Sequence, residues 1–272
     1  MRLDGDGDRS NVEDRRGLIT GGRLGLGGIL LLGVLSLVFK QDLFALLGQS
    51  GTTTQAQGPQ ADQRRQAEAG LEKVAVGTFN DAQQVWKQKI RGYRDAKLVL
   101  FWDEVQSGCG GAAAEMGPFY CPADERVYID LGFYRELARR FGAPGDFAQA
   151  YVIAHEVGHH VQNLLGTGGK VQRAMQQDPS RRNPLSVRLE LQADCFAGVW
   201  GNSAAQRGLL DPGDVDEGLR AAAAVGDDRL QQATGRRVTP ETFTHGSARD
   251  RARWFRTGLE SGSVDACDTF SQ

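Results

Sequence analysis

The sequence predicts an α+β protein that combines a mainly helical domain, a small β-sheet and one apolar segment ahead of both. Residues 147–165 and 187–207 are rich in apolar side chains and are predicted as long helices. Residues 97–105 and 126–131 are rich in β-branched and aromatic side chains and are predicted as strands. The uninterrupted apolar run over residues 24–39 is typical of a transmembrane helix.

The composition is that of an ordinary globular protein. The chain has 272 residues, of which 40% are hydrophobic and 24% charged, and its net charge is −2. This length is sufficient for one sizeable core with appendages. The near-neutral charge gives no electrostatic reason to expect nucleic acid as a partner.

Residues 1–23 are polar and glycine-rich and are predicted as a flexible tail. This segment holds five arginines: Arg2, Arg9, Arg15, Arg16 and Arg23. Because these arginines precede the apolar run, the positive-inside rule places the tail in the cytoplasm and the rest of the chain outside.

Residues 24–40 are predicted as a single membrane anchor in contact with lipid, with Lys40 at its end. A cleaved signal peptide is an alternative, but no A-x-A-like site follows the run. A buried core helix is a second alternative, which the many glycines disfavour. Residues 41–70 are predicted as a flexible linker, and residues 71–272 as the folded domain.

A helical pattern begins at Leu71, and Asn80 and Asp81 could cap a second helix. The two predicted strands flank a glycine-rich loop over residues 107–112. An extended peptide could add to an exposed edge of such a sheet, although the strands could equally serve only the core. Further short helices are predicted over these ranges: 133–141, 215–225 and 247–259. Residues 167–184 are polar, hold two prolines and are predicted as a surface loop or part of a cleft rim.

The predicted helix over residues 147–165 carries His155, Glu156 and His159 in the spacing H-E-x-x-H. Positions i and i+4 share a helix face, so both histidines can bind one Zn²⁺. Glu156 is placed to act as a general base on a water at the metal. The alternative is a pair of surface histidines beside a solvated glutamate, but the flanking residues are apolar. His160 lies about 100° around the helix from His159 and is predicted to pack or support rather than bind metal.

A catalytic zinc site needs a third protein ligand and one open position. Glu190 and Asp194 lie four residues apart on the second long helix and share a face. Glu190 is predicted as the third ligand, and Asp194 as the acceptor of a hydrogen bond from a ligand imidazole. The alternative is two acids on a solvated face, which the apolar neighbours weaken.

The four cysteines, which allow three pairings, have no zinc-knuckle spacing. A Cys109–Cys121 disulfide would clip the glycine-rich loop, and a Cys195–Cys267 disulfide would join the second long helix to the C-terminal tail. An extracytoplasmic domain permits both. Four free buried thiols are the alternative.

Several motifs resemble the bacterial family called putative neutral zinc metallopeptidases, over about residues 70–272. They are A-H-E-V-G-H-H-V-Q from Ala154, L-E-L-Q-A-D-C from Leu189, G-P-F-Y-C-P-A-D from Gly117 and T-H-G-S from Thr244. The resemblance implies a membrane-anchored, zincin-like metalloprotease domain of mixed α+β structure that uses Zn²⁺ to hydrolyse peptide bonds. Two histidines with a glutamate on the next helix are also similar to the gluzincin peptidases.

His245 and Arg251 lie six residues apart, which resembles the H-P-x-x-x-x-R stretch of some membrane peptidases, with Gly246 in place of the proline. One of the two is therefore expected to face the cleft and stabilise a tetrahedral oxyanion. The alternative is that His245 caps the last helix and Arg251 forms a structural ion pair.

Together these features predict a membrane-anchored zinc endopeptidase that faces outward and acts on a peptide or protein. Two other functions fit the same motif. One is a non-catalytic, membrane-tethered scaffold that keeps zinc for structure, which the intact Glu156 argues against. The other is a zinc amidohydrolase that acts on a non-peptide amide such as cell-wall material.

Overall fold

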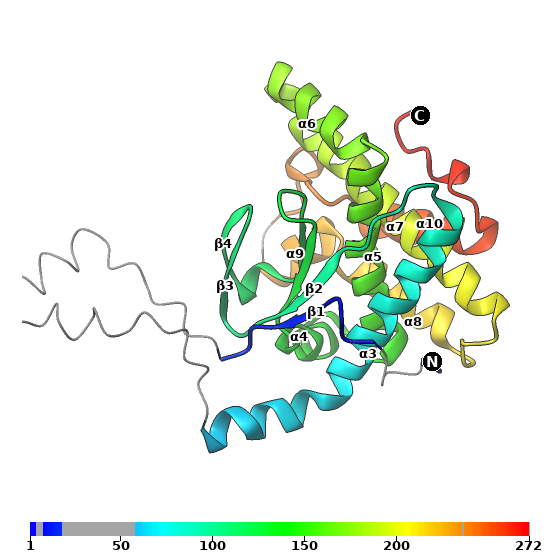
Figure 1. Cartoon of the computed structure of the whole chain (residues 1–272). Helices are drawn as coiled ribbons and strands as arrows, with labels where there is room; N and C mark the ends of the chain where they lie inside the picture. Colours follow the sequence, from blue (N-terminus) through cyan, green and yellow to red (C-terminus); the bar gives the residue numbers. More distant parts are fainter. Residues whose placement is uncertain (4–7, 18–57, 236, 272) are drawn as a thin grey trace, which may run out of the picture.

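The computed structural model describes residues 1–3, 8–17, 58–235 and 237–271 (Figure 1). The domain is mainly helical, with a small sheet beside the helices, as the sequence predicts. The long helices are α3 (Pro59–Lys89), α5 (Asp146–Leu164), α7 (Arg182–Gln206) and α10 (Ala248–Ser261). The shorter helices are α4 (Gly132–Phe141), α6 (Thr167–Gln177), α8 (Asp214–Ala224) and α9 (Asp227–Ala233). The strands are β1 (Val12–Asp14), β2 (Lys97–Leu100), β3 (Glu104–Ser107), β4 (Gly110–Ala113), β5 (Phe119–Cys121) and β6 (Arg126–Ile129).

Helix α5 lies at the centre of the molecule and packs against α3, α7 and α8. Its core-facing side chains are fully buried, including Phe147, Ile153 and Val157. The helix ends where the sequence predicts, because Gly166 adopts the left-handed conformation with φ of 73°. The predicted cap Asp146 is instead the first helical residue, and Gly145 precedes it with φ of 118°.

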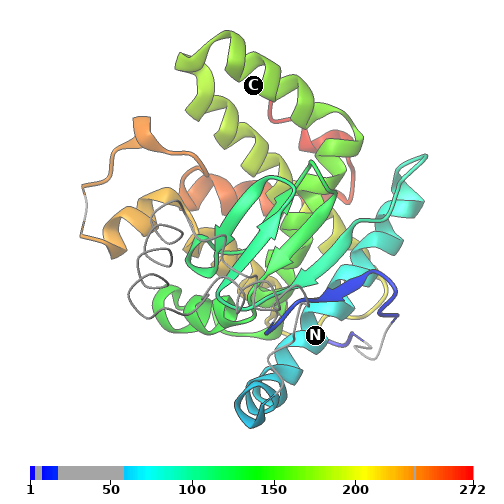
Figure 2. The same ribbon diagram turned by 60° about the vertical axis from the view of Figure 1, so that its left-hand side comes forward.

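The main sheet has the strand order β1-β2-β6-β5, in which β1, β2 and β6 are parallel and β5 is antiparallel to β6. Figure 2 shows these strands side by side, with β1 next to β2. The single predicted strand over residues 97–105 divides in two. Asp103 has φ of 62°, which turns the chain between the end of β2 and the hairpin of β3 and β4.

The prediction of a separate, flexible tail over residues 1–23 is wrong for its described part. Val12, Glu13 and Asp14 pair in parallel with Leu98, Val99 and Leu100 of the domain. The Arg16 side chain, two residues farther on, is only 2% exposed. Strand β1 has no hydrophobic alternation, so its order comes from pairing with a distant strand rather than from a local pattern.

Other predictions for the helical segments differ from the structure. Helix α3 begins at Pro59, so the predicted linker over residues 41–70 is helical from that proline onward, and the helix continues without a second cap at Asn80. Asp81 instead accepts hydrogen bonds from Trp200 Nε1 and from Arg207. Residues 167–184 are largely helical rather than a loop, because α6 occupies their first part, but Gly168, Gly169 and Gln172 line the cavity over the candidate site, which confirms the alternative of a cleft rim.

Both predicted disulfides are present. Cys109–Cys121 joins the turn of the β3–β4 hairpin to β5, and Cys195–Cys267 joins α7 to the C-terminal segment. The predicted anchor over residues 24–40 lies outside the described residues. Among the helices that the structure describes, none is both long enough and apolar enough to cross a membrane.

Candidate metal centre

Helices α5 and α7 approach closely at the point where they carry the predicted ligands. A side-chain carbon at Gly158 would lie 3.0 Å from the Ala193 carbonyl oxygen. Glycine at position 158 therefore lets α7 lie directly against the face of α5 that carries the two histidines. A larger side chain there would separate the helices and move Glu190 away from the histidines.

The structure brings together the three residues predicted as ligands. The Oε2 atom of Glu190 lies 3.2 Å from His155 Nε2, and its Oε1 atom lies 3.4 Å from His159 Nε2. One ligand atom from each residue falls within 4.8 Å of the others, which is close enough to share one ion. Two imidazole nitrogens and one carboxylate are a donor set that suits catalytic zinc.

Each candidate ligand histidine is oriented through its other ring nitrogen. The Nδ1 atom of His155 donates to Asp194 Oδ1 at 2.8 Å, as the sequence predicts for Asp194. The Nδ1 atom of His159 donates to Gln162 Oε1 at 2.9 Å, and the Gln162 amide donates to the Leu189 carbonyl on α7. These hydrogen bonds therefore turn Nε2 of both histidines toward Glu190 and the candidate metal position.

Opposing effects set the ionisation of these groups. Burial disfavours the charged form of His155, but the charge and hydrogen bond of Asp194 raise the pKa of His155 to about 10. Burial would raise the pKa of the Glu190 carboxyl, but the imidazoles of His159 and His155 hold it well below its usual range. Glu190 is therefore an anionic ligand candidate at neutral pH.

Asp194 is fully buried and is the centre of a polar network. Arg251 donates through Nε to Asp194 Oδ2 at 2.8 Å and through Nη2 to Oδ1 at 2.9 Å. The Tyr151 hydroxyl also donates to Asp194 Oδ1, at 2.5 Å. Burial would raise the pKa of the Asp194 carboxyl, but Arg251 and His155 keep it below its usual range.

Arg251 forms the structural ion pair that was the alternative to an oxyanion role. Its side chain is 4% exposed, and its Nη1 donates to the Val225 carbonyl. Helix α10 packs close enough to α7 for Arg251 to reach Asp194. Gly198 on α7 lies against the backbone of α10, and Gly258 on α10 lies against the backbone of α7. Arg251 therefore fixes the carboxylate that orients His155, and it also lines the cavity, with its Nη2 atom 3.8 Å from Glu190 Oε2.

Glu156 lines the cavity beside the two histidines, and the residue is 7% exposed. No group in the described part of the chain forms a hydrogen bond or ion pair with its carboxylate. A buried carboxylate that faces the cavity with its oxygens uncommitted is available to accept a proton there.

His245 lies on the wall of the same cavity and pairs with a residue that the sequence analysis did not single out. Its Nδ1 atom lies 3.1 Å from Asp227 Oδ1. Asp227 Oδ2 also accepts from the backbone N–H groups of Thr244, His245 and Gly246, which fixes the loop that carries the imidazole. The hydrogen bond to Asp227 raises the pKa of His245, against the opposing effect of burial.

His160 is not part of the candidate metal site formed by His155, His159 and Glu190. Its Nε2 donates to the Arg94 carbonyl at 2.7 Å, and its Nδ1 accepts from the Tyr120 hydroxyl at 3.0 Å. Asn163 donates to the same hydroxyl. Burial lowers the pKa of His160, so the neutral ring holds β5 against α5.

A cavity of about 1000 Å³ opens over these residues. Its walls come from α4, α5, α6, α7, the 225–251 region and the segment that leads into β5. The predicted strands over 97–105 and 126–131 supply β2 and β6, which lie inside the described sheet. The strand at the sheet edge beside the cavity is β5, whose residues Phe119 and Tyr120 line it.

The sequence did not identify three further residues of the site, which are Tyr151, Gln162 and Asp227. Tyr151 and Gln162 had a usable signal, because they lie four residues before His155 and three after His159, and so near a ligand on the helix surface. Asp227 had none, because nothing in its spacing from His245 indicates contact.

The chain is similar to known proteins over most or all of its length. A family model described as "Putative neutral zinc metallopeptidase" matches residues 1–270. A protein of Escherichia coli K12 named "Uncharacterized protein YpfJ" is 44% identical over 289 residues, which span all of this chain and 99% of that protein. The "Uncharacterized protein Rv2575" of Mycobacterium tuberculosis is 47% identical over 207 residues, which span 72% of this chain and 69% of that protein.

No solved structure shows significant similarity to the chain. The family match extends over almost the whole sequence, including the H-E-x-x-H helix and the residues that pack around it. The chain belongs to the family of putative neutral zinc metallopeptidases.

Proposed function

We propose that this protein is a zinc-dependent metallopeptidase that hydrolyses peptide bonds. The observation that carries the proposal is the joint arrangement of His155, His159 and Glu190 around one point, with the free carboxylate of Glu156 beside it. Zinc bound there would polarise the scissile carbonyl and lower the pKa of a bound water to about 7.

Residues of the chain would supply the general base, orient the metal ligands and bind the peptide. Glu156 would accept the proton of the attacking water and return it to the leaving amine. Asp194 and Gln162 would hold the two imidazoles in one tautomer, so that each Nε2 faces the metal. The free edge of β5 would offer main-chain groups to an extended peptide.

His245 is the better supported of the two candidates for oxyanion stabilisation. Both residues line the cavity, but the His245 side chain is 49% exposed, whereas Arg251 is 4% exposed and donates to Asp194 and to the Val225 carbonyl. Asp227 occupies Nδ1, which leaves Nε2 as the donor available toward the cavity. The raised pKa keeps the imidazolium form present at higher pH than for an isolated histidine.

Metal removal tests the proposal directly. We expect the full chain to bind one zinc ion and to cleave an unfolded protein such as casein. Cleavage should stop on chelation and return when zinc is added, because the metal supplies the electrophile and the activated water. Zinc content by elemental analysis and casein fragments by mass spectrometry are the measurements.

Different failures have different meanings. A folded chain that binds no zinc would contradict the metal site itself. A chain that binds zinc and releases products from cell-wall fragments, but not from peptides, would favour the amidohydrolase alternative. Zinc without hydrolysis of either substrate class would favour the scaffold alternative.

A second prediction concerns His245. Replacing it by alanine should lower kcat by about 10²–10³-fold with little change in KM, as for the loss of one oxyanion donor. In the unmodified protein, this contribution should be present at low pH and lost as the pH rises through the raised pKa of His245. Turnover as a function of pH measures both effects.

Gln172, which also lines the cavity, is the matched control for that variant. The Gln172→Ala change should leave kcat and its pH profile close to those of the unmodified protein. Unchanged turnover in the His245→Ala variant would remove the imidazole from the mechanism.

The two disulfides support a location outside the reducing cytoplasm. We propose that the domain functions there, close to a membrane to which the apolar residues 24–40 attach it. The attachment rests on the sequence alone, since those residues lie outside the described part of the chain.

A further inference from the structure

The N-terminal segment is built into the main sheet. Strand β1 pairs in parallel with β2, and Val12 lies opposite Leu98. Two backbone hydrogen bonds extend the contact beyond the strand: Leu98 N donates to the Asn11 carbonyl, and Arg15 N donates to the Leu100 carbonyl, both at 2.8 Å. The segment therefore covers the edge that β2 would otherwise expose.

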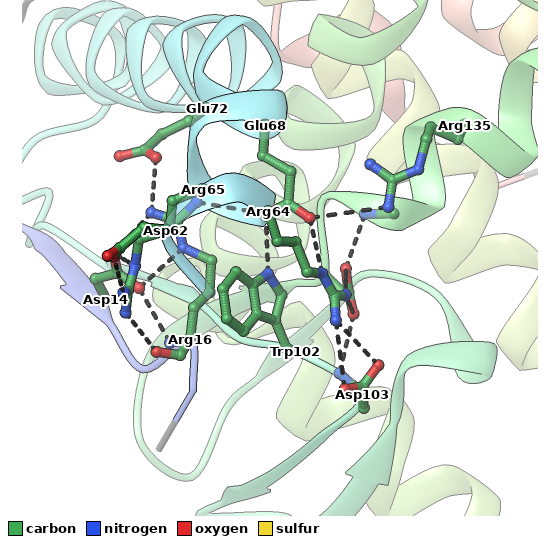
Figure 3. A network of polar contacts seen from close by, with 12 residues as sticks. Asp14, Arg16, Asp62, Arg64, Arg65, Glu68, Glu72, Trp102, Asp103 and Arg135 are labelled. Carbon is green, nitrogen blue, oxygen red and sulfur yellow. Dashed lines mark hydrogen bonds and ion pairs between the residues drawn. The ribbon is translucent and has the colours of Figure 1, made fainter. Parts of the chain in front are cut away.

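A buried polar network continues this contact just after β1 (Figure 3). Arg16 is 2% exposed, and its Nη2 lies 2.6 Å from Asp14 Oδ2 and 2.7 Å from Glu72 Oε2. Glu68 is fully buried, lies 3.5 Å from Arg16 Nη1 and accepts from Trp102 Nε1 at 2.9 Å. Removal of Arg16 would take the closest cation from Asp14 and Glu72 and one of several cations from the buried Glu68, which Arg64 also contacts.

Helix α3 supplies the other side of the same network. Arg64 donates to Glu68 at 3.1 Å, and its guanidinium lies 4.5 Å from the centre of the Trp102 ring. Arg65 donates to the Arg16 carbonyl at 2.7 Å. The residues that precede the 18–57 stretch and those that follow it are therefore held together by direct contacts.

The arginines that suggested a cytoplasmic tail are engaged on the domain. Arg2 pairs with Asp211 at 3.1 Å, and its backbone N–H donates to the Leu209 carbonyl. Arg9 pairs with Glu72 on α3. Arg15 pairs with Glu13 at 2.6 Å. With Arg16 buried, every arginine of the segment that the structure describes contacts a domain residue or β1.

These contacts conflict with one membrane crossing between β1 and α3. The hydrocarbon core of a bilayer is about 30 Å thick, whereas the N–H and C=O groups of paired strands are in direct contact. We infer that residues 1–17 are a structural part of the metallopeptidase domain and lie on the same side of the membrane as the candidate zinc site.

This inference replaces the predicted topology in which residues 1–23 are cytoplasmic and the domain is outside. It does not depend on whether the chain cleaves peptides. It also holds if β1 comes from a second copy, because that strand too must reach the compartment in which β2 lies.

Single cysteines on the two segments test the inference in the full chain. All four native cysteines are in disulfides, so an added thiol is labelled against a low background. Arg9→Cys marks the N-terminal segment and Lys73→Cys marks α3, both at exposed positions. Intact spheroplasts are treated with a membrane-impermeant maleimide, and detergent-lysed spheroplasts provide the full signal.

We expect the two variants to behave alike in intact spheroplasts, with both labelled if the domain is outside. Labelling of one position and protection of the other would place a membrane between β1 and α3 and overturn the inference. Zinc content measured on the same samples checks that each variant retains its fold.

A cross-link tests the contact itself. Arg9 touches Glu72, whereas the neighbouring Lys73 points about 100° away around α3. Because the two long side chains meet at their tips, the thiols of the double variant Arg9→Cys/Glu72→Cys should be joined within the chain by a short, membrane-permeant bis-maleimide in spheroplasts. Arg9→Cys/Lys73→Cys should be joined more slowly, and absence of the cross-link in the first variant would overturn the docking.

Discussion

Replacing Glu156 by glutamine should abolish peptide cleavage while leaving zinc bound. Glutamine keeps the size of the side chain but cannot take a proton from the attacking water. Loss of a positioned general base lowers turnover by about 10²–10⁴-fold. The two histidines and Glu190 would be untouched, so the zinc content should stay at the level of the unmodified protein.

The control for this variant is Glu136→Gln, which changes another carboxylate on the cavity wall. Glu136 is 49% exposed and pairs with Arg140 on α4, away from the ligand helices. Its replacement should leave turnover nearly unchanged. Retention of activity in the Glu156→Gln variant would show that Glu156 is not the base, and loss of its zinc would show that Glu156 acts on the metal site instead.

Replacing Arg251 by leucine should destabilise the metal-free protein by about 3–5 kcal/mol, because it leaves the buried charge of Asp194 without its main partner. Asp194 is fully buried, and Arg251 is the largest favourable influence on its ionisation. Urea unfolding of the chelated protein at neutral pH measures the change in the free energy of unfolding. Arg256→Leu, an exposed change on the same helix, should stay within about 0.5 kcal/mol.

The pH dependence gives a second signature of the same charge. In the unmodified protein the pKa of Asp194 is depressed, so its pairing stabilises the fold at neutral pH and is lost as the pH falls through that value. Without Arg251, burial should raise the pKa of Asp194. Protonation of Asp194 at lower pH should then remove the cost of burying its unpaired charge. The difference in the free energy of unfolding between the Arg251→Leu variant and the unmodified protein should therefore become smaller toward acidic pH. It should also be smaller in the Arg251→Leu/Asp194→Asn variant, which has no carboxylate at position 194.

The site could be predicted from sequence to the extent that it lies on helices. His155, His159, Glu190 and Asp194 each follow from four-residue spacing on two strongly apolar helices. The partner of Asp194 could not be chosen, because the contact with Arg251 depends on how closely α7 and α10 approach. That approach is set by Gly198 and Gly258, whose packing roles have no local pattern.

The fold was least predictable near the N-terminus. Helix α3 begins with Pro59 at its first turn, followed by alanine, glutamine and arginine, which favour helices, yet the polarity of residues 59–70 resembles that of a linker. Strand β1 has only three residues, and its sequence Val-Glu-Asp gives no strand signal. Its structure depends on β2, which lies far along the chain.

That separation has a kinetic consequence. Val12 and Leu98 pair in parallel although the whole 18–57 stretch and α3 lie between them in sequence. Contacts between such distant residues incur the entropy of closing a long loop before they gain any stabilisation, and they form slowly. Residues 1–17 leave the ribosome before β2 does, but β2 must exist before β1 can join it. We therefore expect the N-terminal segment to be the last part of the sheet to assemble and the first to open under denaturant.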